Sequence, residues 1–362
     1  MAGRRVKSGS RIDSASLLAD LSNAFGVAGF EEEVREVIRG YVTPMADEVA
    51  VDALGNLIAT KRGKSDFTLM LDAHMDEIGL MVSFIDKEGY LRFTSLGGWD
   101  PRVLPSHAVT IQTRSGRKVR GVMGTAPPHV QKGGDTDKAY KMEELFIDIG
   151  AASREDVEKM GVRVGDPAAP CYAFERLYGD CVMGKAFDDR TGCAVMVKVL
   201  DTVRKDKLDL TLVCNFAVCE EMGMRGAKTA AFRIKPDMAL AFEGTTACDM
   251  PGVSEERQVA RQGKGPAITV ADRSIIVKRE MVKTLEDLAA KNKIPVQHKA
   301  PIFGATDAGE IQLSREGVLA GVLSVPCRYI HSCHSTLRLS DFDYTVDLAA
   351  AFVRECRRRL FG

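Results

Sequence analysis

Polar side chains of the kinds that bind metal ions stand at five points where an apolar run ends or a helix is expected to begin. In chain order these points are His74 with Asp76, Asp188–Asp189, Glu220–Glu221, Glu243 and His331. We expect all five to lie at the ends of strands, because open α/β sheets gather their sites at the carboxyl ends of their strands. Imidazole and carboxylate donors without thiolates suit Zn, Co or Mn and argue against a structural zinc site. The pattern therefore favours a catalytic metal centre.

Residues within one motif can have different roles. Side chains two apart in a strand point to the same side, so His74 can bind a metal while Asp76 accepts its other ring N–H and fixes the tautomer. In Asp188–Asp189, one carboxylate is expected to bridge two metal ions and the other to be structural, although such pairs can also be simple helix caps. In Glu220–Glu221, one glutamate is expected to bind metal and the other to act as general base.

The elements that position these residues follow from the hydrophobic pattern. Residues 13–43 predict two helices, the first capped by Asp13–Ser14 and the second carrying Glu31–Glu33 at its N-terminal end, where the helix dipole favours negative charge. Short strands are expected at 55–60 and 68–73. After residue 180, the pattern predicts helices at 190–205, 226–232, 274–293, 307–316 and 340–360, the last capped by Ser340, and strands at 210–218, 238–242 and 318–325. This alternation implies a sheet covered by helices on both faces.

The stretch between the two α/β parts is rich in turns and short strands. Two hairpins are expected, 82–85 with 90–93 and 109–113 with 119–122, and one short helix at 154–160. We therefore predict a β domain at 79–172, inserted into a catalytic α/β domain formed by 1–78 and 173–362.

Composition argues against several classes of protein. Lys+Arg and Asp+Glu are both 50, and this zero net charge argues against a nucleic-acid or anionic-membrane binder. No apolar run reaches the roughly 18 residues of a membrane span. The nine cysteines include no Cys-x-x-Cys pair, which is typical of reduced thiols in a cytoplasmic protein. The basic start, Met1–Arg11, lacks the apolar segment of a secretory signal and is expected to be a flexible tail. Gly263–Gly265 lacks the spacing of a phosphate-binding loop.

Seven motifs together resemble the tetrahedral (TET) aminopeptidases, the forty-second metallopeptidase family, which includes the glutamyl aminopeptidases. Members of this family often carry the name endoglucanase. The motifs are His74–Gly79, Gly97–Asp100, Ala186–Gly192, Glu220–Ala227, Gly263–Pro266, Ala305–Ala308 and Arg328–Ser332. They span most of the chain, and their combination is far more specific than any one of them.

The resemblance implies two divalent metal ions per subunit, Zn or Co, with Mn as a further candidate. It also implies their ligands: His74 for one ion, His331 for the other, Asp188 as the bridge, and Glu221 and Glu243 with one bond each. Glu220 would be the general base and acid, and Asp76 would orient His74. A hydroxide bridging the ions would attack the first peptide carbonyl, so the implied activity is removal of N-terminal residues from short peptides.

The resemblance also implies an architecture and an assembly. The fold class would be α/β, with a mixed sheet sandwiched by helices, as in phosphorylase/hydrolase-like aminopeptidases, and a small β-barrel-like inserted domain. In the family this domain forms dimers, and the dimers build tetrahedral dodecamers. A homo-oligomer is therefore expected.

The chain departs from the family pattern at two places. After the second histidine the family usually has Ser-Pro and a glutamate, whereas Ser332–Ser335 reads Ser-Cys-His-Ser, so His334 competes with His331 as a ligand. Many members have aspartate at the position of Glu243. By the same resemblance, residues 261–263 and 303–306 are expected to line the specificity pocket.

Two other activities are alternatives. A related di-metal carboxypeptidase or deacylase shares the metal chemistry. A glucan hydrolase is disfavoured because only 6% of the residues are aromatic, with one Trp, and the histidines would have no role.

Overall fold

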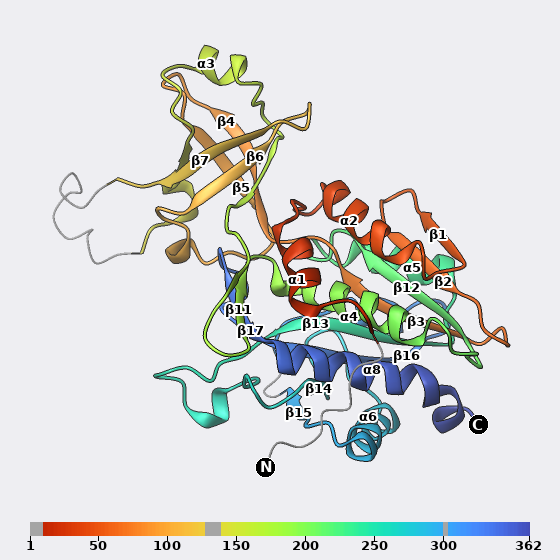
Figure 1. The fold of residues 1–362 in the computed structure, drawn as a ribbon. Helices are drawn as coiled ribbons and strands as arrows, with labels where there is room; N and C mark the ends of the chain where they lie inside the picture. The colour runs from red at the N-terminus through yellow and green to blue at the C-terminus, as the bar shows by residue number, and fades with distance from the viewer. Residues whose placement is uncertain (1–9, 127–138, 300–302) are drawn as a thin grey trace.

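The chain forms an 11-stranded mixed sheet flanked by helices and, above it in Figure 1, a closed barrel of six strands. The computed structural model describes residues 10–126, 139–299 and 303–362. Most of the predicted basic tail, residues 1–9, lies outside the described residues. The predicted fold class, a mixed sheet between helices with a small additional barrel, is confirmed.

The large sheet has parallel strands at its centre. In spatial order its main strands are β1 (Glu48–Val51), β2 (Leu57–Lys61), β12 (Thr211–Ala217), β3 (Thr68–His74), β13 (Met238–Thr246), β16 (Leu319–Arg328), β17 (Ser335–Arg338), β11 (Cys181–Gly184) and β10 (Glu175–Arg176). β14 (Ala267–Thr269) pairs with β16 and with β15 (Gln297–Lys299). β3 runs parallel to β12 and β13, and β13 runs parallel to β16. These four strands are almost entirely buried, as expected for parallel strands with helices on both faces.

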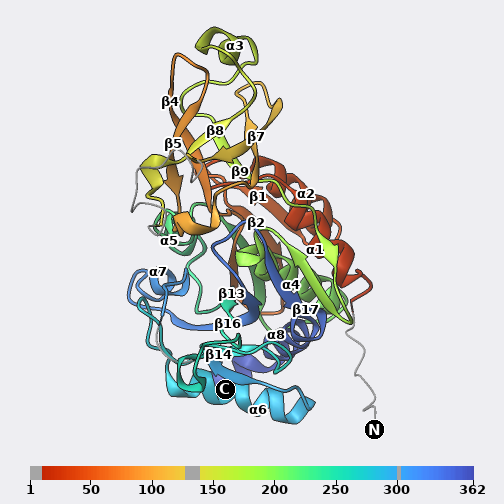
Figure 2. The same ribbon diagram turned by 90° about the vertical axis from the view of Figure 1, so that its left-hand side faces the viewer.

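Helices cover both faces of this sheet (Figure 2). One face carries α1 (Ser14–Asn23), α4 (Phe187–Val203) and α8 (Leu339–Leu360), and the other carries α5 (Arg225–Ile234) and α7 (Ala308–Gln312). α2 (Glu32–Val42) packs against α1 and α4, and α6 (Arg279–Asn292) packs against α8. Among the described residues, no helix is long and apolar enough to cross a membrane.

Two helix caps test the predictions about helix ends. Asp13 caps α1 as predicted, since its carboxylate accepts the N–H of Ser16 at 2.8 Å. The predicted cap of α8 by Ser340 is wrong. The helix begins one residue earlier, and the carboxylate of Asp180, from the turn before β11, accepts the N–H of Ser340 at 3.2 Å. A distant residue thus replaces the local cap.

Two predicted helices are too long. α6 begins at Arg279, because the carboxylate of Asp272 holds the N–H groups of Ser274 and Ile275 at 2.7 and 2.9 Å in a turn. α7 ends at Gln312, and a turn returns the chain so that the next strand can start.

All six barrel strands lie between Gly79 and Pro170. Around the barrel they are β4 (Gly79–Ile85), β5 (Leu91–Leu96), β8 (Phe146–Asp148), β7 (Lys118–Gly124), β6 (Ala108–Gln112) and β9 (Pro167–Pro170). The predicted hairpins β4–β5 and β6–β7 are both present, and α3 (Arg154–Lys159) lies at the outer end of the barrel (Figure 1). Alternate residues of the barrel strands, such as Val82 and Ile111, point inward and form a separate hydrophobic core inside the barrel. The domain boundaries at 79 and 172 stay a prediction.

Candidate metal centre

The motif residues come together at one end of the central strands. His74 is the last residue of β3, and Glu220–Glu221 follow the neighbouring β12. Glu243 lies inside β13 rather than beyond its end, because that strand continues to Thr246. The parallel register of β3 and β13 brings Glu243 level with His74.

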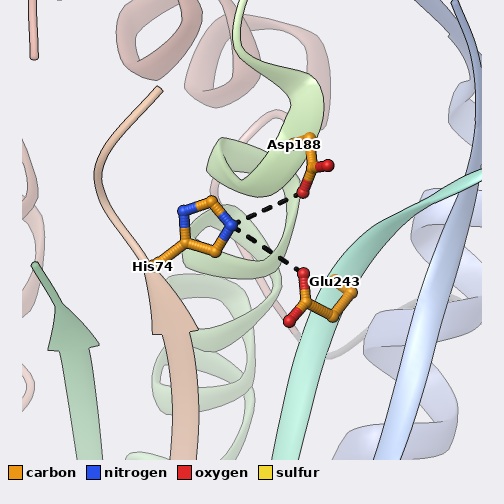
Figure 3. Close-up of side chains that lie close together, drawn as sticks. All are labelled: His74, Asp188 and Glu243. Carbon is orange, nitrogen blue, oxygen red and sulfur yellow. Dashed lines mark ion pairs between the residues drawn. The ribbon is translucent and has the colours of Figure 1, made fainter. Parts of the chain in front are cut away.

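Two further side chains complete the cluster. His331 comes from the loop between β16 and β17, and Asp188 comes from the first turn of α4. The expectation that all five motifs lie at strand ends is therefore wrong for Glu243, whereas Asp188 follows the end of β11 by four residues. Figure 3 shows Asp188 and Glu243 approaching the same ring nitrogen of His74 from different elements.

Asp188 lies between the two histidines. Its Oδ1 is 3.5 Å from His74 Nε2, and its Oδ2 is 3.4 Å from His331 Nε2. The His74 nitrogen is also 3.8 Å from Glu243 Oε2, while His331 Nε2 is 3.3 Å from Glu221 Oε1. The arrangement therefore consists of two donor groups that share one aspartate.

Carbonyl oxygens orient both histidines. His74 Nδ1 is 2.9 Å from the backbone oxygen of Asp76 and 3.5 Å from its carboxylate, so the expected contact to the side chain is the longer one. His331 Nδ1 is 2.8 Å from the backbone oxygen of Gly98. A carbonyl only accepts, so each Nδ1 carries a hydrogen, and each Nε2 can bind a cation once it holds no proton of its own.

The Asp76 carboxylate instead organises the glutamate pair. It accepts the N–H of Glu220 at 3.0 Å and that of Glu221 at 3.1 Å. The motif that positions one histidine therefore also positions the turn after β12. Sequence spacing could not reveal this link, because β3 and β12 are far apart along the chain.

The adjacent aspartates have different surroundings. Both have non-helical backbone angles, so Asp188 points into the cluster. Asp189 is fully buried, and its Oδ1 accepts the N–H of Gly192 at 2.9 Å. A side chain at Gly192 would place its Cβ 2.4 Å from the Asp189 carboxylate, which explains the glycine. Asp189 acts as a cap, and Asp188 is left as the donor.

The barrel contributes one loop to the cluster. Gly97–Trp99 follows β5 and supplies the carbonyl that holds His331, a contact that sequence analysis missed. Gly97 has a φ of +83°, and a Cβ there would lie 2.6 Å from Ile78 and 3.0 Å from the Glu221 carboxylate. Trp99 anchors the loop by donating its ring N–H to the Gly79 oxygen at 2.9 Å.

The raised pKa values of three glutamates show that the cluster would be stabilised by added positive charge. Burial and the neighbouring carboxylates raise the pKa of Glu220 to about 8, although His74 opposes this. Burial likewise raises the pKa of Glu221 to about 7 and that of Glu243 well above its usual value. Burial alone would raise the pKa of Asp188 too, but its two histidine partners hold it below the ordinary value.

The residues fit a divalent cation site. Three sets of donor atoms each lie within 4.8 Å of one another: His74–Asp188–Glu243, His74–Glu220–Glu221 and Asp188–Glu221–His331. Within the described parts of the chain, no lysine or arginine forms an ion pair with these four carboxylates. Buried carboxylates without such partners are costly, and a bound cation removes that cost.

His334 lies apart from this cluster. Its ring stacks on Tyr172 at 4.7 Å and lies 5.8 Å from the His107 ring. It belongs to none of the donor groups found among the described residues, whereas His331 does.

The residues expected at the specificity pocket have other contacts. Arg261 pairs with Glu255 at 2.6 Å and lines a hollow of about 610 Å³ that none of the cluster residues borders. Gln262 donates to the Thr336 oxygen at 2.7 Å. Their role in specificity stays a prediction, and residues 300–302, which precede the second expected segment, lie outside the described residues.

Comparisons with known proteins show the family to which the chain belongs. The profile of the M42 glutamyl aminopeptidase family matches residues 55–348. The lysyl aminopeptidase of Pyrococcus furiosus is 34% identical, over 94% of this chain and 97% of its own. The TET aminopeptidase of Thaumarchaeota archaeon SCGC AB-539-E09, from marine sediment, has a TM-score of 0.92 at 37% identity, covering 94% and 96% of the chains. The Pyrococcus horikoshii TET1 peptidase, which can assemble into a tetrahedron or a large octahedral shell, has a TM-score of 0.85 at 34% identity, covering 95% and 100%.

The chain therefore belongs to the M42 glutamyl aminopeptidase family. It is an aminopeptidase, a peptide hydrolase that removes residues from the N-terminus, and its family is one of metallopeptidases.

Proposed function

We propose that this aminopeptidase uses two divalent metal ions per subunit, bound by the cluster described above. His74 and Glu243 would hold one ion, His331 and Glu221 the other, and Asp188 both. The observation that carries this assignment is the position of Asp188, whose two oxygens face different histidines at 3.5 and 3.4 Å. Nitrogen and oxygen donors suit Zn or Co, and Mn is also compatible.

The proposed chemistry divides the work between the ions and the protein. When bound, such a pair of ions polarises the scissile carbonyl and lowers the pKa of a water molecule towards 7. Glu220 takes the proton from the attacking water while the oxygen bonds to the carbonyl carbon. Glu220 then gives that proton to the leaving nitrogen as the C–N bond breaks. Its location next to His74, 3.8 Å from Nε2, supports this role.

The backbone contacts described above would keep these groups in place. Asp76 holds the amides of Glu220 and Glu221, and the carbonyls of Asp76 and Gly98 hold the two imidazoles. Preorganised groups of this kind reduce the reorganisation needed to reach the transition state.

Metal content tests the two-ion proposal. Purified protein saturated with Zn and freed of excess should hold two ions per subunit by mass spectrometry of the metal. His331→Ala should hold one ion or fewer, and His334→Ala, the matched control three residues away, should hold two. One ion in the unmodified protein, or loss of an ion in His334→Ala alone, would contradict the assignment.

We also propose short peptides as substrates and a tetrahedral dodecamer built from dimers as the assembly. The relatedness to the TET1 peptidase supports the assembly. The nine free cysteines fit the cytoplasm, where thiols stay reduced. The family is named for glutamyl residues, whereas a relative is named for lysyl residues.

A further inference from the structure

Glu31 contacts the turn that carries Glu220 and Glu221, although it lies 188 residues before Cys219 in the sequence. Sequence analysis gave it only a favourable charge at the start of α2. In the structure the residue is 3% exposed. Its Oε1 accepts the N–H of Gly29 at 2.8 Å and the N–H of Cys219 at 3.1 Å. A carboxylate buried this deeply is costly unless its oxygens accept hydrogen bonds, so these two contacts stabilise Glu31 in this position.

Glu31 and Asp76 together hold three consecutive backbone amides. Glu31 accepts from Cys219, and Asp76 accepts from Glu220 and Glu221. Burial raises the pKa of the Glu31 carboxyl to about 7, and the negative charge of the nearby Asp76 adds to this effect. Two acidic side chains therefore lie under one short turn and bind its N–H groups.

The turn needs such support. Cys219 has a φ of +54°, in the left-handed region that a residue with a side chain rarely adopts. Such a conformation persists only where the surroundings hold it. Because Cys219 immediately precedes Glu220, its backbone angles set the direction in which the Glu220 side chain leaves the turn.

We propose that Glu31 is a positioning residue for the peptidase reaction. By holding the Cys219 amide it keeps the Glu220 carboxylate aimed at the reacting atoms. The proposal rests on the proposed role of Glu220 as general base. Glu31 acts through the backbone rather than on the substrate, and it lies outside the residues 55–348 that match the family profile.

Three variants test this proposal. Glu31→Met keeps the volume and removes the acceptor, Glu31→Gln keeps an acceptor oxygen, and Glu32→Met changes an exposed neighbour on the same helix. With saturating metal, Glu31→Met should lower kcat by about tenfold to a hundredfold, with KM nearly unchanged, because small displacements of a catalytic group are this costly. Glu31→Gln should restore most of the rate, and Glu32→Met should match the unmodified enzyme. If Glu31→Met does not fold, Glu31→Asp, which withdraws the carboxylate by one methylene, takes its place.

A double variant separates positioning from a general structural role. Since Glu31 acts through Glu220, Glu31→Met combined with Glu220→Gln should be no slower than Glu220→Gln alone. Unchanged kcat in Glu31→Met, equal loss in Glu31→Gln, or multiplying effects in the double variant would overturn the proposal. A fully active Glu220→Gln would instead overturn the role of Glu220, and the two failures are thus distinguishable.

Discussion

At the scale of single residues, every donor of the proposed metal centre stands in a short sequence motif. His74, Asp188, Glu221, Glu243 and His331 are all within the cluster, and His334 is not. The choice between Asp188 and Asp189 could not be made from the residues alone. It depends on which carboxylate caps α4, and that is a matter of backbone angles and of the contact to Gly192.

Metal uptake should release protons. Without metal, Asp188 and Glu221 raise the pKa of His331 to about 10 against the effect of burial, and burial raises that of Glu220 to about 8. At pH 7 both groups are therefore protonated in the metal-free protein, whereas a bound imidazole and a working base must lose their protons. We expect at least one proton per subunit to be released at pH 7, and metal affinity to fall as the pH is lowered.

Calorimetry of Zn binding in two buffers with different ionisation heats measures this release. The apparent binding enthalpies per subunit in the two buffers should differ by at least the difference between the two ionisation heats. Equal enthalpies in both buffers would show that no proton leaves and would contradict the proposed protonation of the metal-free cluster.

At the scale of elements, the hydrophobic pattern predicted the central strands and most helices. The residues that each of these elements buries form a recognisable pattern within one short segment of the sequence. The ends of elements were less predictable where a distant side chain decides them. Asp180, in the turn before β11, caps α8, and the turn held by Asp272 makes α6 start later than predicted. The carbonyl of Gly98, in the loop after barrel strand β5, holds His331, in the loop between β16 and β17 of the large sheet. Residue spacing in the sequence cannot predict a contact of this kind.

Arg190 ties α4 to the loop that follows His74. It is fully buried and donates to the backbone oxygens of Met75 at 2.5 Å and Gly26 at 3.0 Å, with Glu77 at 3.4 Å. Replacing it by Met leaves several buried acceptors without donors, each costing roughly 1–3 kcal/mol. We expect Arg190→Met to lower the free energy of unfolding by at least about 3 kcal/mol and to weaken metal binding.

Urea unfolding, followed by fluorescence, measures this effect. Arg62→Met is the control, because the Arg62 side chain is 69% exposed and its ion pair with Glu48 lies at the surface. Such pairs contribute under about 1 kcal/mol. Similar shifts in the two variants would contradict the claim that Arg190 holds the site together.

At the scale of the whole molecule, the two-part architecture was visible in the sequence as a change from helix-and-strand alternation to short strands. The closure of six strands into a barrel could not be seen in the sequence. Closure depends on the pairing of β4 with β9, and these two strands are far apart in the sequence. The assembly likewise could not be predicted from the hydrophobic pattern of the chain and was expected only from the family resemblance.

We predict a particle of twelve subunits, with a mass of about twelve times 39.4 kDa. Light scattering coupled to size-exclusion chromatography, over a dilution series, measures this mass directly. Dimers at the lowest concentrations would agree with assembly from dimers. A monomer at every concentration would contradict the proposed assembly.

The most direct test of the central claim is a single set of hydrolysis assays on aminoacyl-p-nitroanilides. Metal-stripped enzyme, the same enzyme reloaded with Zn, Co or Mn, and reloaded Glu220→Gln are compared, with N-acetylated substrates as controls. We predict that only the reloaded enzyme cleaves, that it cleaves only free N-termini, and that Glu220→Gln retains metal but loses about 10²–10⁴-fold in kcat. Cleavage without metal, cleavage of acetylated substrates, or an unimpaired Glu220→Gln would contradict the account.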